Sequence, residues 1–151
     1  MALSHYLQLS TRMKPAQALE HLTSQIPGLI WSEDRYLLID PTIKIHAAES
    51  RALTQDIIQD AFQFKPTLTI GFRFTNNTDD DRARHLMFQA TMLMLEKAQD
   101  AVLLFNGEII VLQWFGGQLA FNSDHHVWDE GWLRSKLTHP FECRPLPSPL
   151  L

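Results

Sequence analysis

The amino-acid sequence predicts an α+β fold, a single domain in which a largely antiparallel sheet packs against two or three helices. The first reason is size and composition: the 151 residues are 45% hydrophobic and 20% charged, as in one ordinary globular domain. The second is the predicted order of elements, β-α-β-β-β-α-β-α-β-β-β, in which short turns join consecutive strands and make them antiparallel neighbours. We expect residues 1–144 to form the domain and residues 145–151 to form a proline-rich tail, either frayed or laid along a surface.

The first half of the chain predicts strands around two amphipathic helices. The helix at residues 14–26 ends at Pro27-Gly28, and the helix at residues 50–64 ends before Pro66, because a residue that precedes proline avoids the helical conformation. Strands are predicted at residues 1–8, 29–32, 36–40, 42–47 and 67–75, of which the last shows the cleanest alternation of apolar and polar side chains.

The second half predicts one long helix, a three-stranded meander and a short last helix. The long helix, residues 79–98, begins with three aspartates that suit a helix start, and its second half is apolar on nearly all sides. Asn106-Gly107 is a strong signal for a tight hairpin turn. The meander strands are predicted at residues 101–105, 108–114 and 118–121, and the last helix at residues 127–137.

Charge and cysteine content argue against several classes of function. Thirteen Lys and Arg against 17 Asp and Glu give a net charge of −4, which argues against binding to nucleic acid or to an anionic membrane. No apolar run approaches the roughly 20 residues that span a bilayer, and the N-terminal sequence lacks the features of a signal peptide. The single cysteine, Cys143, cannot form an intramolecular disulfide, so we expect a soluble protein in the cytoplasm.

Two polar clusters contain residue types that bind metals. Capping of the helix start already accounts for Asp79, Asp80 and Asp81. The segment 124–126 (Asp-His-His), with Asp129 and Glu130 behind it, would need a further histidine to form the site of a metal-dependent hydrolase. Adjacent histidines on a strand point to opposite faces, and the spacing matches no metal motif, so an exposed loop is favoured. We expect no metal and no cofactor.

Nucleophilic catalysis finds little support in the sequence. Cys143 is followed by Arg144 and lies four residues after His139, but no second motif accompanies them. The G-x-S-x-G motif of serine hydrolases and the glycine-rich phosphate-binding motifs do not occur. The sequence therefore favours a protein that is not an enzyme.

Aromatic and acidic residues occur together near the C-terminus. Trp128 and Trp132 flank Asp129 and Glu130, and on a helix a spacing of four places both indoles on one face. The two indoles either cover the sheet core or form a surface for a protein partner, since aromatic residues concentrate at interface hot spots. The candidate partner-binding residues are Asp79, Asp80, Asp81, Trp128, Asp129, Glu130 and Trp132.

The stretch from residue 69 to residue 113 resembles a known family. It combines a strand ending in Phe-Arg-Phe (72–74), an acidic loop, a helix containing Met-Leu-Met-Leu (92–95), and the sequence D-A-V-L-L-F-N-G-E at residues 100–108. These features are similar to those of small bacterial immunity proteins of the swarming-inhibition type, which neutralise a cognate toxin in kin discrimination. The resemblance implies toxin binding without catalysis, and it supplies no functional residues.

The sequence thus predicts a cytoplasmic, non-catalytic protein-binding module, an immunity or antitoxin-like protein that occludes a toxin domain. Acidic charge would speed association with a basic partner, and buried aromatic side chains would set the affinity. Two alternatives stay open. One is the metal-dependent hydrolase built on residues 124–130, and the other is a homo-oligomeric module, such as a homodimer, that uses a strand edge or the meander as its contact surface.

Overall fold

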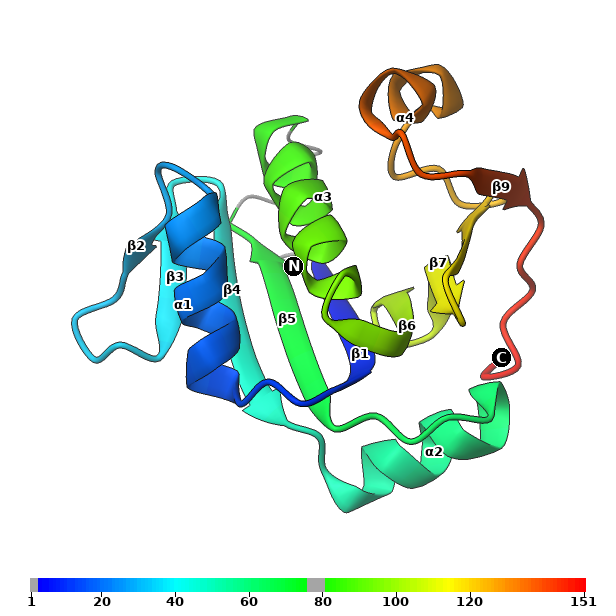
Figure 1. Cartoon of the computed structure of the whole chain (residues 1–151), viewed down its shortest axis with the longest axis horizontal. Coiled ribbons are helices and arrows are strands. Elements are labelled where there is room, and N and C mark those ends of the chain that lie inside the picture. The colour runs from blue at the N-terminus through cyan, green and yellow to red at the C-terminus, as the bar shows by residue number, and fades with distance from the viewer. Residues whose placement is uncertain (1–2, 76–80) are drawn as a thin grey trace.

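A computed structural model of the chain describes residues 3–75 and 81–151, and within them a mostly antiparallel sheet of nine strands with four helices confirms the α+β class (Figure 1). The elements are β1 (Ser4–Thr11), α1 (Pro15–Gln25), β2 (Ile30–Trp31), β3 (Leu37–Asp40), β4 (Ile43–Glu49), α2 (Ala52–Phe62), β5 (Leu68–Phe74), α3 (Asp81–Leu95), β6 (Ala98–Phe105), β7 (Ile109–Phe115), β8 (Gln118–Asn122), α4 (Glu130–Lys136) and β9 (Phe141–Arg144).

The first strand lies at the centre of the sheet. The strand order is β2-β3-β4-β5-β1-β6-β7-β8-β9, so β1 pairs with β5 on one side and with β6 on the other. Leu7 is opposite both Ile70 and Leu103, and β1 accordingly lies between β5 and β6 in Figure 1. All neighbouring strands are antiparallel except β8 and β9, which are parallel.

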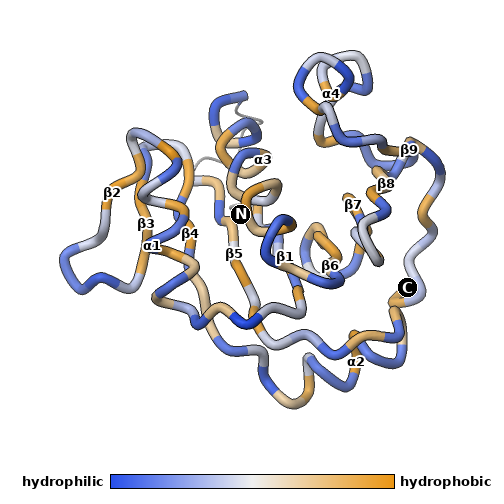
Figure 2. Tube along the Cα trace, in the orientation of Figure 1, coloured by the Kyte–Doolittle hydropathy of each residue, from blue (hydrophilic) through white to orange (hydrophobic). Residues whose placement is uncertain are grey.

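The two faces of the sheet are covered differently. Helices α1, α3 and α4 contribute to one large hydrophobic core, and α1 and α3 lie in front of the sheet in Figure 1. On the other face, Ile58 of α2, Phe64 and Leu146 cover only the half formed by β6, β7 and β8. Figure 2 shows the same pattern along the chain: the strands are mainly hydrophobic, and the loop between β2 and β3 is hydrophilic.

The turn between β6 and β7 confirms the predicted hairpin. Asn106 and Gly107 have φ angles of 52° and 77°, and Glu108 N donates to Phe105 O at 3.1 Å. Two positive φ angles in succession give a turn whose twist matches that of the flanking strands. The meander itself is present, and β9 then pairs with the outer edge of β8.

The predicted end of the long helix is wrong by three residues. Helix α3 ends at Leu95 and β6 begins at Ala98, although residues 79–98 were expected to be helical. Lys97 O accepts a hydrogen bond from Thr11 Oγ1 at 2.7 Å, which ties this segment to the end of β1. A contact across the sheet therefore overrides the local helical spacing. The predicted start at residue 79 lies outside the described residues.

Helix α4 is also shorter than residues 127–137, the range expected from the sequence. It begins at Glu130 because Asp129 is its N-cap, with Asp129 Oδ2 accepting from Trp132 N at 3.2 Å. After it, the sequence did not predict β9. The chain then joins the second hydrophobic cluster, which Ile58, Phe64 and Leu146 form against β6, β7 and β8. There the backbone of buried Leu146 makes two hydrogen bonds with the Asn122 carboxamide, at 3.1 and 3.2 Å.

A buried carboxylate fixes the start of α3 to the sheet. Asp40, at the end of β3, is 2% exposed and accepts hydrogen bonds from the Arg82 guanidinium, the shortest at 2.7 Å, and from Thr42. Burial alone would raise the pKa of Asp40, but these hydrogen bonds outweigh it and lower the pKa to about 2. None of the helices in the part of the chain that the structure describes is long and apolar enough to cross a membrane.

Candidate functional site

Two segments that are far apart in the sequence lie against each other at one end of α3. Trp128 Nε1 donates to the backbone oxygen of Arg84 at 2.9 Å. The Trp132 ring stacks on His85, with the ring centroids 4.6 Å apart and the planes 5° from parallel. The predicted acidic helix start and the predicted Trp-acid segment are therefore neighbours in space.

These contacts define one surface patch, which we call the α3–α4 surface. It contains the candidate residues of both segments that reach solvent, together with the histidine between them. Its residues are Asp81, His85, Asp129, Glu130 and Trp132. Two other candidates, Asp79 and Asp80, lie outside the described residues.

The two tryptophans occupy different environments. Trp128 is only 5% exposed, and its ring meets Phe88 and Phe121 edge-on at centroid distances of 5.4 and 6.0 Å. Trp132 is only partly buried and packs edge-on against Phe88 at 4.8 Å. Trp128 thus belongs to the core, and Trp132 leaves part of its indole at the surface. Since α4 begins at Glu130, helical spacing does not join the two rings; both are joined through α3.

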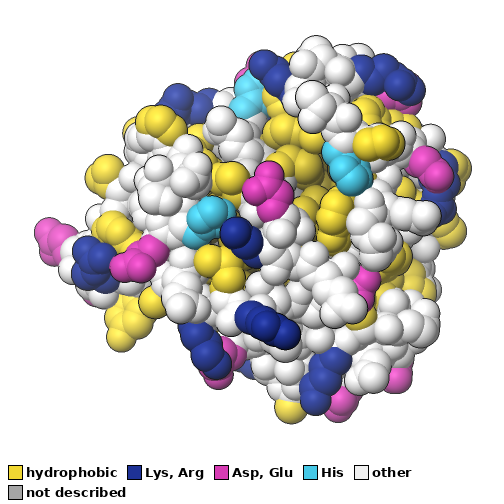
Figure 3. Space-filling view, in the orientation of Figure 1, with side chains coloured by type: hydrophobic (Ala, Val, Ile, Leu, Met, Phe, Trp, Pro, Cys, Tyr) yellow, Lys and Arg dark blue, Asp and Glu magenta, His cyan; other side chains and the backbone are white. Residues whose placement is uncertain are grey.

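Each described acid of the α3–α4 surface already has an intramolecular partner. Asp81 forms an ion pair with Arg84, Glu130 pairs with Arg134 at 2.9 Å, and Asp129 caps α4. Figure 3 accordingly shows basic side chains beside acidic ones near the upper end of α3 and near α4. Exposed ion pairs contribute only about 0–1 kcal/mol. A basic group on a partner could therefore replace Arg134 at little cost, whereas Arg84 is only 17% exposed.

The histidines near residue 125 contact aromatic rings. His125 stacks on Phe105 at a centroid distance of 5.1 Å, and on the other side Phe105 packs against His5 at 5.0 Å. His5 is 3% exposed, and its Nδ1 has no hydrogen-bond partner among the described residues. Burial and, to a lesser degree, the neighbouring His125 lower the pKa of His5 to about 4.

The described residues do not assemble a metal site around this segment. Across residues 3–75 and 81–151, no three His, Cys, Asp or Glu side chains form a group that could hold a metal ion. The hydrolase interpretation built on residues 124–130 is therefore not favoured.

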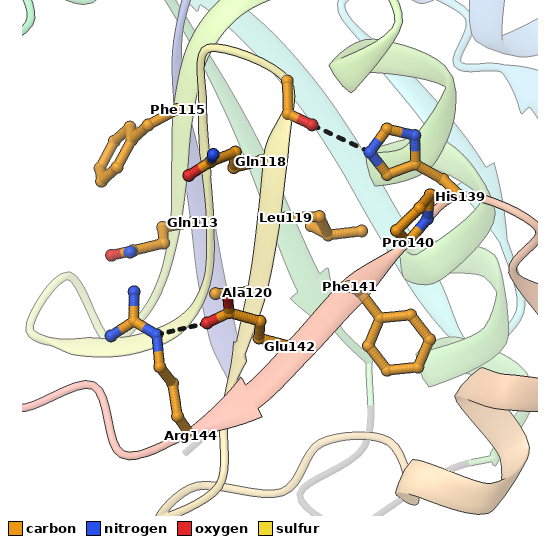
Figure 4. A pocket seen from close by; sticks show the side chains of 11 residues that line it. Gln113, Phe115, Gln118, Leu119, Ala120, His139, Pro140, Phe141, Glu142 and Arg144 are labelled. Atoms are coloured by element: carbon orange, nitrogen blue, oxygen red, sulfur yellow. Dashed lines mark hydrogen bonds and ion pairs between the residues drawn. The ribbon is translucent and has the colours of Figure 1, made fainter.

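A groove of about 350 Å³ lies beside β8 and β9 (Figure 4). Phe115 and Phe141 contribute its apolar walls. Two of its polar side chains already have partners: His139 Nε2 lies 2.9 Å from Gly117 O, and Arg144 Nε donates to Glu142 at 2.9 Å. No Ser, Thr, Cys or Lys is among the described residues that line it.

The environment of Cys143 disfavours its thiolate form. Burial, followed by the interaction with Glu130, raises the pKa of Cys143 to about 11. A reactive cysteine requires the opposite effect, a positive environment that stabilises the thiolate.

Comparison with known protein families identifies the family of the chain. A protein-family model described as SitI3-like matches residues 3–132. The matched range contains residues 69–113, which carry the sequence resemblance, and it ends at Trp132 of the α3–α4 surface. No curated protein and no solved structure matches the chain.

Proposed function

Because the chain belongs to the SitI3-like family, we propose that it is an immunity protein that binds a cognate toxin and prevents its action. The observation that carries this proposal is the family match, which spans residues 3–132. The resemblance of residues 69–113 to swarming-inhibition immunity proteins lies within this range and points to the same role. The lone cysteine suits an action in the cytoplasm.

The toxin would be covered by the α3–α4 surface. Trp132 presents a partly exposed indole that is already held between His85 and Phe88, so little side-chain entropy would be lost when a partner packs on it. Trp128 contributes from below, because its hydrogen bond to Arg84 O keeps the segment against α3. Asp79 and Asp80 stay predicted partner-binding residues and lie outside the described residues.

The acids would act mainly on the rate of association. Asp81 and Glu130 are exposed, and the exposed Glu130–Arg134 pair is weak, so basic groups of the toxin can compete for these acids as the two proteins meet. Occlusion of the toxin's active site by the α3–α4 surface requires no chemistry from this chain.

The experiment is co-expression with the toxin encoded beside this gene, together with a pull-down of that toxin. Wild-type protein should protect cells and bind the toxin. Trp132→Ala should weaken binding by about 30-fold, the effect of losing a hot-spot aromatic of about 2 kcal/mol. Tyr36→Ala is the matched control, because Tyr36 is a 74% exposed aromatic on the β2–β3 side of the sheet. An adjacent toxin that neither binds nor is neutralised would refute the proposal.

Charge reversal tests the surface separately from the function. Glu130→Arg should slow association with the toxin, whereas Asp56→Arg, at an exposed position of α2, should leave it unchanged. If the wild-type protein protects but neither Trp132→Ala nor Glu130→Arg affects binding, the immunity function stands and the proposed surface is wrong.

A further inference from the structure

On the face of the sheet opposite α1 and α3, the second hydrophobic cluster covers β6, β7 and β8 and leaves the other half uncovered. On β1, β5 and β4 this half carries polar side chains, and a cavity of about 430 Å³ opens there beside the start of α2. Small-molecule sites in proteins have volumes of about 300–1,000 Å³. The lining residues used below are Tyr6, Gln8, His46, Arg51, Thr54 and Thr69.

A buried carboxamide supplies a donor in this cavity. Gln8 is 6% exposed, and its Oε1 accepts a hydrogen bond from Thr69 Oγ1 at 2.7 Å. Thr69 Oγ1 also lies 3.1 Å from Ser50 Oγ, which can supply its second hydrogen bond. These contacts fix the Gln8 amide with its NH₂ away from Thr69. No residue in the described part of the chain accepts a hydrogen bond from that NH₂.

The start of α2 adds positive character at the rim of the cavity. Arg51 is the N-cap residue and makes no side-chain capping bond, and the first turn contains no acid. No carboxylate within that turn therefore offsets the free N–H groups and the helix dipole, although Glu49 contributes a carboxylate at the rim. Both Arg51 and Thr54 line the cavity. The carboxylate of Glu49, also at the rim, lies 4.0 Å from Lys14 Nζ.

Beside the cavity, Gly71 makes room for the His46 ring at a cost to the sheet. Gly71 lies in β5 between Tyr6 and His46, whose rings are 6.4 Å apart. A Cβ atom on residue 71 would come within 2.0 Å of the His46 ring, so only glycine leaves room for it. Glycine inside a strand is unfavourable and commonly marks a close approach of another group.

Two cationic side chains lie on the same face of the sheet, next to the row formed by Tyr6, Gly71 and His46. Lys44 and Arg73 are directly opposite each other on β4 and β5, both are exposed, and neither forms an ion pair with a described residue. Like charges at opposed positions destabilise a sheet. Sequences depart from such local rules mainly at functional sites. Donors and positive charge thus gather on one polar face.

We propose that this cavity binds an oxyanion, the carboxylate or phosphate group of a small molecule. The Gln8 NH₂ and the Arg51 guanidinium donate to it, and Lys44 and Arg73 raise the local positive potential that draws it in. The site lies on the face of the sheet opposite the α3–α4 surface. It is therefore independent of toxin binding.

The test is titration of ¹⁵N-labelled full-length protein with inorganic phosphate and, separately, with acetate, against sodium chloride at equal ionic strength. Either anion should shift the Gln8 side-chain amide resonances and the Thr54 amide resonance in a saturable manner, and chloride should not. A response to phosphate alone identifies a phosphate ligand, and a response to acetate alone identifies a carboxylate. No saturable shift with either anion overturns the proposal.

Variants distinguish the site from general anion effects. Arg51→Gln, at an exposed position, should weaken anion binding about tenfold, the effect of one charge-assisted hydrogen bond. Arg12→Gln removes another exposed guanidinium outside the cavity and should bind as the wild type does. Gln8→Glu keeps the acceptor for Thr69 but replaces the NH₂ donor, so it should abolish binding. Equal affinity of Arg51→Gln and wild type would contradict the assignment even if Gln8→Glu did not fold.

Discussion

Replacing His5 by phenylalanine should remove a large part of the acid sensitivity of the fold. His5 lies in β1 between Phe74 and Phe105, with ring centroids 5.3 and 5.0 Å away, and is almost completely buried. Its pKa falls from 6.5 to about 4, first because of burial and second because of His125. The folded protein therefore holds His5 neutral under conditions in which the unfolded chain binds a proton.

The sign and size of the effect follow from this difference. Since the folded pKa lies below the unfolded one, the contribution of neutral His5 is complete above about pH 6.5 and is lost as the pH falls toward 4. The lost stability is about 2 kcal/mol at pH 5 and about 3 kcal/mol once the pH is below 4. Other histidines with a lowered pKa, such as His46, act in the same direction in both proteins.

The assay is urea unfolding at pH 7.5 and pH 5.0. Between these pH values, the free energy of unfolding should fall by about 2 kcal/mol less in His5→Phe than in the wild type. His139→Gln, which changes an exposed histidine, should show the wild-type fall. If His5→Phe and wild type lose the same stability, then His5 is not protonated on unfolding and the reasoning fails.

Three stability predictions follow from other contacts, each measured as a free energy of unfolding. Leu146→Ala should cost about 2–3 kcal/mol because Leu146 is 4% exposed, and Leu151→Ala, at a 79% exposed position, should cost almost nothing. Gly71→Ala should cost about 1–3 kcal/mol by displacing the His46 ring, and adding His46→Ala should recover part of that loss; independent, additive costs would contradict the proposed clash. Asp40→Asn should cost about 2 kcal/mol at pH 7 and little near pH 2, because the depressed pKa of Asp40 stabilises the fold above about pH 4 and this contribution is lost as the pH falls toward 2; an unchanged cost at pH 2 would refute this.

Local patterns were enough to predict most of the fold. The alternation in residues 67–75 gives β5, the Asn106-Gly107 pair gives the β6–β7 turn, and helical spacing gives α1 and α2. Strand β9 could not be predicted, because its four residues form a strand only through parallel pairing with β8. A pairing that depends on a distant segment leaves no periodicity in so short a stretch.

The candidate site was predictable only in parts. The sequence singles out Trp132 and the acids near it, but not their position against α3, which depends on the hydrogen bond from Trp128 to Arg84 O. Asp40 looks like an ordinary turn residue until the fold brings the Arg82 guanidinium to it. Gln8 likewise gains its significance only when β1 pairs with β5 and places it beside Thr69. In each case the information lies in a contact between distant segments.

The central position of β1 has a consequence for how the chain reaches its native state. Leu7 and Leu9 are fully buried, and their partners lie on β5 and β6, which are synthesised much later. During translation the first strand therefore has both edges unpaired and its apolar side chains uncovered, a state that is prone to aggregation. Pairing between such distant segments also slows folding. We expect protection of β1 amides to appear late in refolding, together with that of β6, in pulsed hydrogen exchange.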